Sequence, residues 1–169
     1  MSEASKSIFS RDPALRRMAL RTSWGFLATG FGSGLFRSAP GTAGTVVALP
    51  IAAVLAQLPT TLALFAVFSL FAAGVYICRV AAAMLGQSDP GAIVWDEIVG
   101  FCLVAALVPD GWPWLAAAFV TFRFFDIVKP WPIRALERRT HGGFGIMIDD
   151  VVAAFYAVAV LRLIEVLLR

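Results

Sequence analysis

The sequence predicts an all-α, polytopic membrane protein with about five short transmembrane helices and a re-entrant or interfacial N-terminal segment. Of its 169 residues, 60% are hydrophobic and 15% are charged, whereas an average soluble domain is about 25% charged. The mean hydropathy is +0.83. A soluble domain of this length cannot bury so much apolar surface in one core. The bilayer is therefore the expected solvent.

Two regions are expected along the chain. Residues 1–22 are polar and basic and form an N-terminal arm that is mobile or lies on a surface, and residues 23–169 form one membrane-embedded domain. No signal peptide is expected, because neither a long apolar run nor a small-residue cleavage site directly follows the basic residues. Residues 23–45 are rich in glycine, which predicts a short helix followed by a loop.

Five apolar segments, each bounded by turn signals, are expected to cross the membrane. The expected spans are 43–58, 61–84, 92–108, 112–128 and 149–168. Pro50 falls inside the first span, where membrane helices tolerate a kink. Pro130 follows the fourth span, which ends there because proline cannot continue a helix. We expect a short basic helix over 133–140 and a flexible loop over 141–145 before the last span.

Lysine and arginine are concentrated at one set of span ends. The arm and the 126–150 connection are rich in them, whereas the turns at 58–61 and 109–112 contain none. The positive-inside rule then places the arm, the 79–92 loop and the 126–150 connection in the cytoplasm. With five spans, the same face receives all five carboxylates that border the apolar segments. They are Asp96, Glu97, Asp126, Asp149 and Asp150.

Ionised groups in or beside hydrocarbon are expensive, so a membrane protein that keeps five of them is expected to use them. Carboxylates with basic neighbours favour a hard divalent cation and a phosphate. Structural interpretations compete with this one. Asp149 and Asp150 could cap the start of the last helix, and Asp96 and Glu97 could be an interfacial pair in contact with water.

Basic residues accompany the acids. Arg123, Asp126 and Lys129 are spaced by three and share one helical face, where a plain salt-bridge ladder is the alternative to a functional role. Arg134 adds another cation, and arginine suits bidentate contact with phosphate. His141, the only histidine, could transfer protons near neutral pH, or it could be structural in its glycine-rich loop.

Two glycine-rich segments, 30–34 and 40–45, could offer backbone N–H groups to an anion. Ser33 and Thr42 are the candidate substrate-binding residues in them. Close packing of small residues is the competing interpretation. The chain has no P-loop, no zinc-type Cys/His cluster and no G-x-S-x-G motif, which argues against an NTPase, a zinc enzyme and a serine hydrolase. No feature points to a nucleic-acid partner.

Several stretches of the chain closely resemble the phosphatidylglycerophosphatase A family, in family order. They are IVWDE at 93–97, FDIVKPWPIR at 125–134 and HGGFGIMIDD at 141–150, together with GFGSGL at 30–35 and PGT at 40–42. The resemblance runs from about residue 23 to 165. It implies a magnesium-dependent lipid phosphatase of the bacterial inner membrane. Such an enzyme converts phosphatidylglycerophosphate to phosphatidylglycerol and inorganic phosphate, the last step of phosphatidylglycerol synthesis.

The hypothesis is metal-assisted hydrolysis of a phosphomonoester of a membrane phospholipid. The expected ligands for one or two Mg²⁺ ions are Asp96, Glu97, Asp126, Asp149 and Asp150. Lys129 and Arg134, together with Arg123, would neutralise charge on the phosphate, and a carboxylate or His141 would handle protons. Two routes stay open, attack by a metal-bound water and formation of an aspartyl-phosphate.

The main alternative is a small cation- or proton-coupled membrane transporter, because intramembrane carboxylates often carry protons or cations. Against it, the acids gather on one membrane face and no chain of ionisable groups crosses the membrane. A scaffold protein whose charges only set its topology is the other alternative. The number of metal ions, the acyl-chain preference and the oligomeric state do not follow from the sequence.

Overall fold

The computed structural model describes residue 10 and residues 12–169, and the regular elements in this part of the chain are all helices. In chain order they are α1 (Pro13–Arg21), α2 (Ser23–Ala28), the 3₁₀ turn η2 (Ser33–Leu35), α3 (Pro40–Leu55), α4 (Thr60–Leu85), α5 (Trp95–Leu107), α6 (Trp112–Val128), α7 (Ile133–Glu137) and α8 (Gly142–Leu168). The all-α prediction is confirmed.

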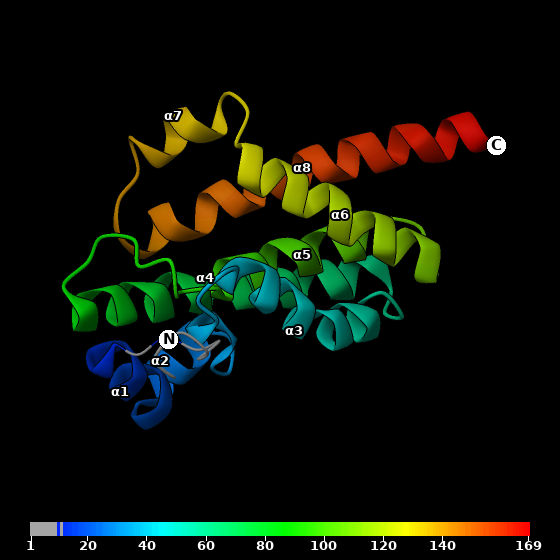
Figure 1. The fold of residues 1–169 in the computed structure, drawn as a ribbon. Coiled ribbons are helices and arrows are strands. Elements are labelled where there is room, and N and C mark those ends of the chain that lie inside the picture. The colour runs from blue at the N-terminus through cyan, green and yellow to red at the C-terminus, as the bar shows by residue number, and fades with distance from the viewer. Residues whose placement is uncertain (1–9, 11) are drawn as a thin grey trace, which may run out of the picture.

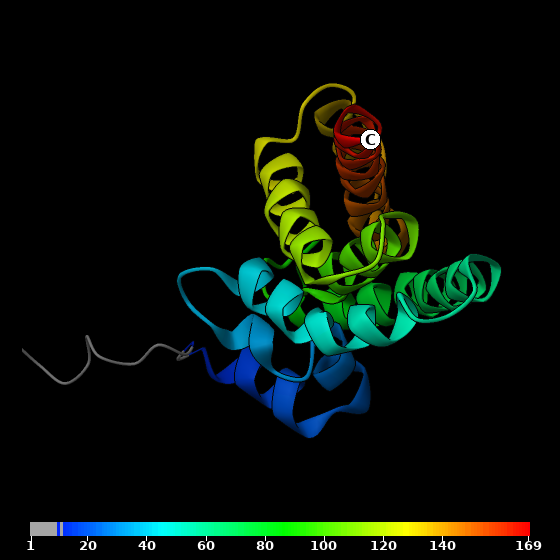
Figure 2. The same cartoon turned by 90° about the vertical axis from the view of Figure 1, so that its right-hand side faces the viewer.

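Helix α5 lies at the centre of the bundle and packs against α3, α4, α6 and α8. In the end-on view, α6 and α8 lie on one side of α5 and α3 and α4 lie on the other (Figures 1 and 2). The successive long helices run in alternating directions (Figure 1). The starts of α3, α5 and α8 and the ends of α4 and α6 consequently point toward one end of the bundle. We call this end the site end.

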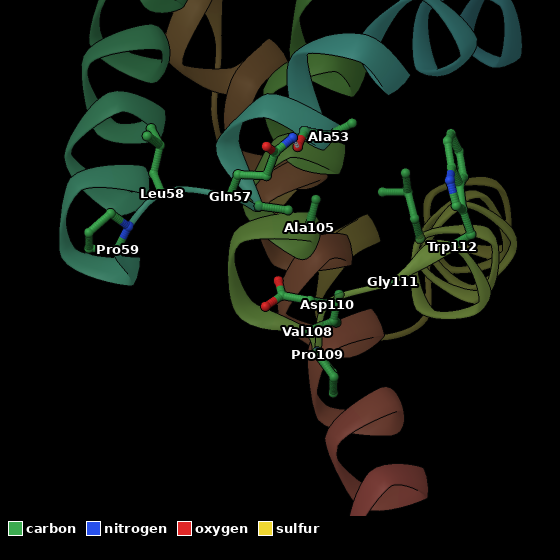
Figure 3. Close-up of a pocket in the computed structure, with 12 residues that line it drawn as sticks. Ala53, Gln57, Leu58, Pro59, Ala105, Val108, Pro109, Asp110, Gly111 and Trp112 are labelled. Atoms are coloured by element: carbon green, nitrogen blue, oxygen red, sulfur yellow. Dashed lines mark hydrogen bonds between the residues drawn. The ribbon is translucent and has the colours of Figure 1, made fainter.

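The opposite end of the bundle holds the turn between α3 and α4 and the turn between α5 and α6. A cavity of about 570 Å³ lies there. Figure 3 shows Gln57, Asp110 and Trp112 among the residues that line it. None of the predicted site residues lines this cavity. This cavity is therefore separate from the five predicted site carboxylates.

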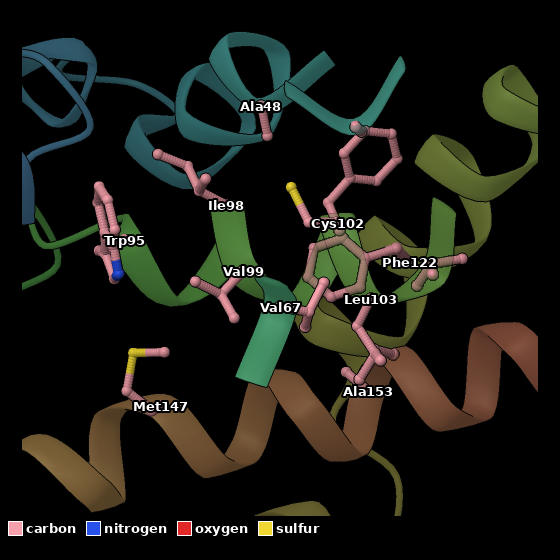
Figure 4. Packing of buried hydrophobic residues seen from close by; sticks show 14 of the residues in the cluster. Ala48, Val67, Trp95, Ile98, Val99, Cys102, Leu103, Phe122, Met147 and Ala153 are labelled. Atoms are coloured by element: carbon pink, nitrogen blue, oxygen red, sulfur yellow. The ribbon is translucent and has the colours of Figure 1, made fainter. Parts of the chain in front are cut away.

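The core forms around α5 because this helix is apolar on every side after its first turn. Nine of its 13 residues are buried, and Figure 4 shows Ile98, Val99, Cys102 and Leu103 packed among side chains from the surrounding helices. A helix that is hydrophobic all round belongs in a protein core or in a membrane. Here the neighbouring helices cover it, so its apolar surface is buried against protein.

Only two helices in the described residues, α4 and α8, are long and apolar enough to cross a bilayer. They have 26 and 27 residues, which correspond to about 40 Å each at 1.5 Å per residue. Helices α3, α5 and α6 have 16, 13 and 17 residues. Their lengths of about 20–26 Å are shorter than the roughly 30 Å hydrocarbon layer. The expectation of about five spans is not confirmed.

Helix α8 begins at Gly142 and not at residue 149, so the expected flexible loop over 141–145 is wrong. Gly143 lies so close to the backbone of Val75 and Arg79 in α4 that a side chain would not fit there. Its role is therefore close helix packing, which small residues permit. One consequence is that Asp149 and Asp150 lie inside α8, which overturns the interpretation that they cap it.

The described part of the N-terminal arm contains a helix, which the sequence analysis did not anticipate. Asp12 caps α1 by accepting a hydrogen bond from the Ala14 backbone N–H at 2.9 Å. Thr22 caps α2 by accepting one from the Gly25 N–H at 3.0 Å. Such caps satisfy N–H groups that a helix leaves free. What we expected of residues 1–9 and 11 lies outside the described residues.

Candidate active site

Carboxylates from separate helices converge at the site end. Asp96 and Glu97 lie in the first turn of α5, Asp150 lies in α8, and one oxygen from each of these three residues falls within 4.8 Å of the others. Asp126, in the last turn of α6, is linked to this group through Arg123, which pairs with both Asp126 and Glu97. Of the five acids expected to share one site, the structure brings Asp96, Glu97 and Asp150 together, and the metal-binding role of all five stays a prediction. The grouped acids meet because the start of α5 packs against the interior of α8, where Asp150 lies.

Several carboxylate oxygens at the site have no hydrogen-bond partner among the described residues although they are buried. They are Asp96 Oδ1, Glu97 Oε2, Asp149 Oδ1 and Asp150 Oδ2. Burying an ionised oxygen without a partner is strongly unfavourable. Oxygens gathered in this way are the donors that a hard divalent cation takes from proteins. The donor set therefore fits Mg²⁺.

Arg123 connects α6 to the acids of α5. Its Nη1 forms an ion pair with Asp126 one turn along the same helix and lies 3.7 Å from Glu97 Oε1. The side chains of all three residues are largely buried. A salt bridge on one helical face therefore exists, as the structural interpretation expected, but it includes Glu97 from a different helix. Arg123 supplies positive charge beside the cluster.

Lys129 does not continue the expected ladder along α6. It ends that helix in the left-handed conformation with φ of 44°, and its Nζ pairs with Asp149 of α8 and with Glu137 Oε1 at 3.3 Å. Burial disfavours the ammonium, but these two carboxylates outweigh it and leave the pKa of Lys129 above its ordinary value. Lys129 is therefore a cation at neutral pH.

The N-terminal turn of α3 forms one wall of the site. A Cβ atom added to Gly41 would overlap Glu97 Oε1 and would lie 3.0 Å from both terminal nitrogens of Arg123. Only glycine lets α3 approach this ion pair so closely. Sequence analysis left the 40–45 segment open between anion binding and close packing of small residues, and the Gly41 contact is of the second kind. The feature of the sequence that points to this contact is Gly41, which follows Pro40 at the start of the helix.

A smaller pocket, of about 280 Å³, opens beside Asp149. It is lined by residues that include Ser88, Glu137, Thr140 and His141. His141 is exposed and occupies the N-cap position of α8. The predicted proton-transfer residue and one of the predicted metal ligands therefore face the same hollow. Glu137, which sequence analysis did not select, also lines it and holds Lys129.

Three predicted residues make other contacts. Arg134 is exposed and donates a hydrogen bond from Nη2 to the Val128 carbonyl at 2.9 Å. The Ser33 hydroxyl is buried and donates to the Thr29 carbonyl at 3.3 Å. Thr42 lies next to Gly41 in the first turn of α3 and is half-buried. No described hydrogen bond or ion pair joins these three residues to the acids, and their substrate-binding roles stay predictions.

Comparison with known proteins gives the same family that the motifs suggested. The phosphatidylglycerophosphatase A family matches residues 26–165. Phosphatidylglycerophosphatase A of Escherichia coli strain K12 is 43% identical over 155 residues, covering 91% of this chain and 90% of the relative. The Haemophilus influenzae protein of the same name is 45% identical over 154 residues, covering 89% and 94%.

A third relative, from Bacteroides thetaiotaomicron, carries the provisional name phosphatidylinositol-3-phosphatase. It is 42% identical over 141 residues, which cover 78% of this chain and 86% of the relative. No solved structure matches the chain. The family match includes all five acids, and two relatives with that family name align along almost the whole sequence. This chain therefore belongs to the phosphatidylglycerophosphatase A family.

Proposed function

We propose that this protein hydrolyses the terminal phosphomonoester of phosphatidylglycerophosphate, releasing phosphatidylglycerol and inorganic phosphate. The names of two relatives support this substrate. The structural observation that carries the proposal is the cluster of Asp96, Glu97 and Asp150, with buried oxygens that lack hydrogen-bond partners. Cations lie beside it, as a phosphate site requires.

The proposal includes a Mg²⁺ site. Asp96, Glu97 and Asp150 would hold the ion, with Asp126 and Asp149 beside them. Bound Mg²⁺ would polarise a phosphate oxygen and lower the pKa of a bound water. Carboxylates alone would repel a phosphate dianion, because like charges at close range repel strongly where water is excluded. The acids therefore support phosphate chemistry only together with a cation.

The neighbouring residues have distinct proposed roles. Lys129 would bind a phosphate oxygen by exchanging its contact with Glu137, which is partly exposed, for one with the substrate. Arg123 would stabilise charge on the opposite side of the cluster. His141 faces the pocket beside Asp149 and would donate a proton to the leaving glycerol oxygen. Arg134, Ser33 and Thr42 would contact the headgroup further out.

We further propose that the site end faces the cytoplasm at the depth of the lipid headgroups. Thr60 and Arg79, the first charged residue of α4, lie about 29 Å apart along the helix, which matches the roughly 30 Å hydrocarbon layer. Arg79 would mark its inner boundary. Gly74 touches Trp95, the residue before Asp96. The acids would then lie about 7 Å inside that boundary, where a lipid phosphate can reach them.

Release of inorganic phosphate from defined substrates tests the proposal. We expect turnover of phosphatidylglycerophosphate to exceed turnover of phosphatidic acid, phosphatidylinositol 3-phosphate and soluble glycerol phosphate. A preference for phosphatidylinositol 3-phosphate would move the assignment toward the third relative's name. Absence of phosphate release from every substrate would reject a phosphatase. A transporter is not favoured, because the acids share one end of the bundle and α4 has no charged residue before Arg79.

A further inference from the structure

Helix α1 has a basic face that the proposed hydrolysis does not use. Arg16, Arg17, Leu20 and Arg21 are all exposed. Successive helical residues are about 100° apart, so these four lie within an arc of about 140°. The two buried side chains of α1 lie on the other side, where the helix meets α2 and α4. We call the four exposed residues the arginine face.

The three arginines have no acidic partner among residue 10 and residues 12–169. The nearest acid in the sequence, Asp12, uses its carboxylate to cap the helix. The arginine face and Pro13 together line a surface hollow of about 390 Å³. Leu20 is 55% exposed in the middle of this basic group. The surface therefore complements a ligand that combines negative charge with an apolar part.

Aromatic residues of the α1–α2 region extend this surface toward the candidate active site. Trp24 and Phe31 are 41% and 44% exposed, and the ring of Phe31 lies 6.4 Å from that of Trp95, centroid to centroid. The Val94 N–H, directly before α5, donates to the Ala28 carbonyl at the end of α2 at 2.9 Å. The arginine face thus belongs to the same end of the bundle as the acids. Exposed tryptophan is typical of membrane–water interfaces.

We propose that the arginine face binds the headgroups of anionic phospholipids at the bilayer surface. Arginine can hold a phosphate through two parallel hydrogen bonds. A short helix with basic residues outward and an exposed leucine among them is suited to lie in the plane of the interface, and each arginine near an anionic leaflet is attracted to it. This binding goes beyond the proposed hydrolysis and does not depend on it.

The test places a fluorescent probe on the arginine face of the full-length protein. Leu20→Cys is labelled with an environment-sensitive fluorophore, because Cys78 and Cys102 are buried and shielded from the reagent. The protein is reconstituted in phosphatidylcholine bilayers with or without phosphatidylserine, which is neither the proposed substrate nor its product. We expect a blue shift of the emission only with phosphatidylserine, and its reversal by high salt, which screens exposed charges.

Charge variants decide whether the arginines cause the shift. Arg16→Gln, Arg17→Gln and Arg21→Gln together should abolish it, while lysine at the same three positions should retain much of it. The matched control replaces Arg138 and Arg139, two exposed arginines next to α7, with glutamine and should leave the shift unchanged. An equal emission in both bilayers, or an undiminished shift in the triple glutamine variant, would overturn the proposal.

Discussion

Replacing Gly41 with alanine tests whether the start of α3 positions the acidic site. The new Cβ would overlap Glu97 Oε1 and lie 3.0 Å from both terminal nitrogens of Arg123, whereas ordinary contacts begin at 3.4 Å. The arginine would have to move by about 0.4 Å. The carboxylate would have to move further, by roughly 1 Å, or α3 would have to withdraw from α5.

The expected consequence is weaker binding of the divalent cation. Displacing a residue that orients metal ligands typically lowers metal affinity by about 10–100-fold, and a misplacement of about 1 Å can lower turnover by about 100-fold. We expect Gly41→Ala to raise the Kd for Mg²⁺ by about tenfold or more. Isothermal titration of the purified protein with Mg²⁺ measures this directly, without relying on turnover.

Gly44→Ala is the matched control, because it adds the same methyl group to the same face of α3. The nearest neighbour of its Cβ would be Val94, at 2.7 Å from Cβ. Overpacking of this kind lowers the free energy of unfolding by about 1–3 kcal/mol, and the added methyl group has neither Glu97 nor Arg123 among its three nearest atoms. The reasoning is refuted if Gly41→Ala binds Mg²⁺ as tightly as the parent, or if both variants lose affinity equally.

Three further predictions concern the acids, the lysine and the helix contact. Asp150→Asn should lower phosphate release by at least about 100-fold while the protein still inserts into membranes. A chelator should have the same effect on the parent protein until Mg²⁺ is restored. Full turnover of the variant, or of the parent in chelator, would contradict the metal site. Lys129→Met should lower kcat/KM by about 10–100-fold, because a hydrogen bond to a charged group contributes about 1.5–3 kcal/mol. Lys129→Arg keeps the positive charge and should retain more activity. Equal losses of kcat/KM in the two variants would indicate a purely structural role. Gly143→Ala should lower the free energy of unfolding in detergent by about 1–3 kcal/mol, since it forces α8 away from α4. Gly91→Ala is the control, because a Cβ atom there meets nothing within 4 Å. Equal free energies of unfolding for the two variants would contradict this account of the packing.

The convergence of the acids was predictable because two simple rules agreed. Charges are costly in hydrocarbon, and helices joined by short turns alternate in direction, so acids near alternate helix ends share one side. The start of α8 was not predictable, because glycines such as Gly143 are loop signals in a sequence. Their use in close contact with α4 depends on a neighbouring helix far away in the chain.

The expectation of about five spans is not confirmed, for a related reason. Hydrophobicity identifies residues that avoid water, but it does not distinguish lipid from protein as their surroundings. Helix α5 is apolar after its first turn and was expected to be a span, and four other helices pack against it. Arg134 shows the same limit for charges, because its position near the acids in sequence did not reveal that it binds the Val128 carbonyl.

The short length of α5 gives the site its depth. A helix of 13 residues, about 20 Å long, begins beside Gly74 near the middle of α4. Its first turn therefore lies within the bundle, where α6 and α8 bring Arg123 and Asp150 toward it. Free N–H groups at this helix start favour the negative charge of Asp96 and Glu97. If α5 were extended at its start by two turns, about 11 Å, acids in its new first turn would reach the water outside the bundle. Because α5 is this short, its carboxylates lie inside the bundle, where Asp150 of α8 meets them.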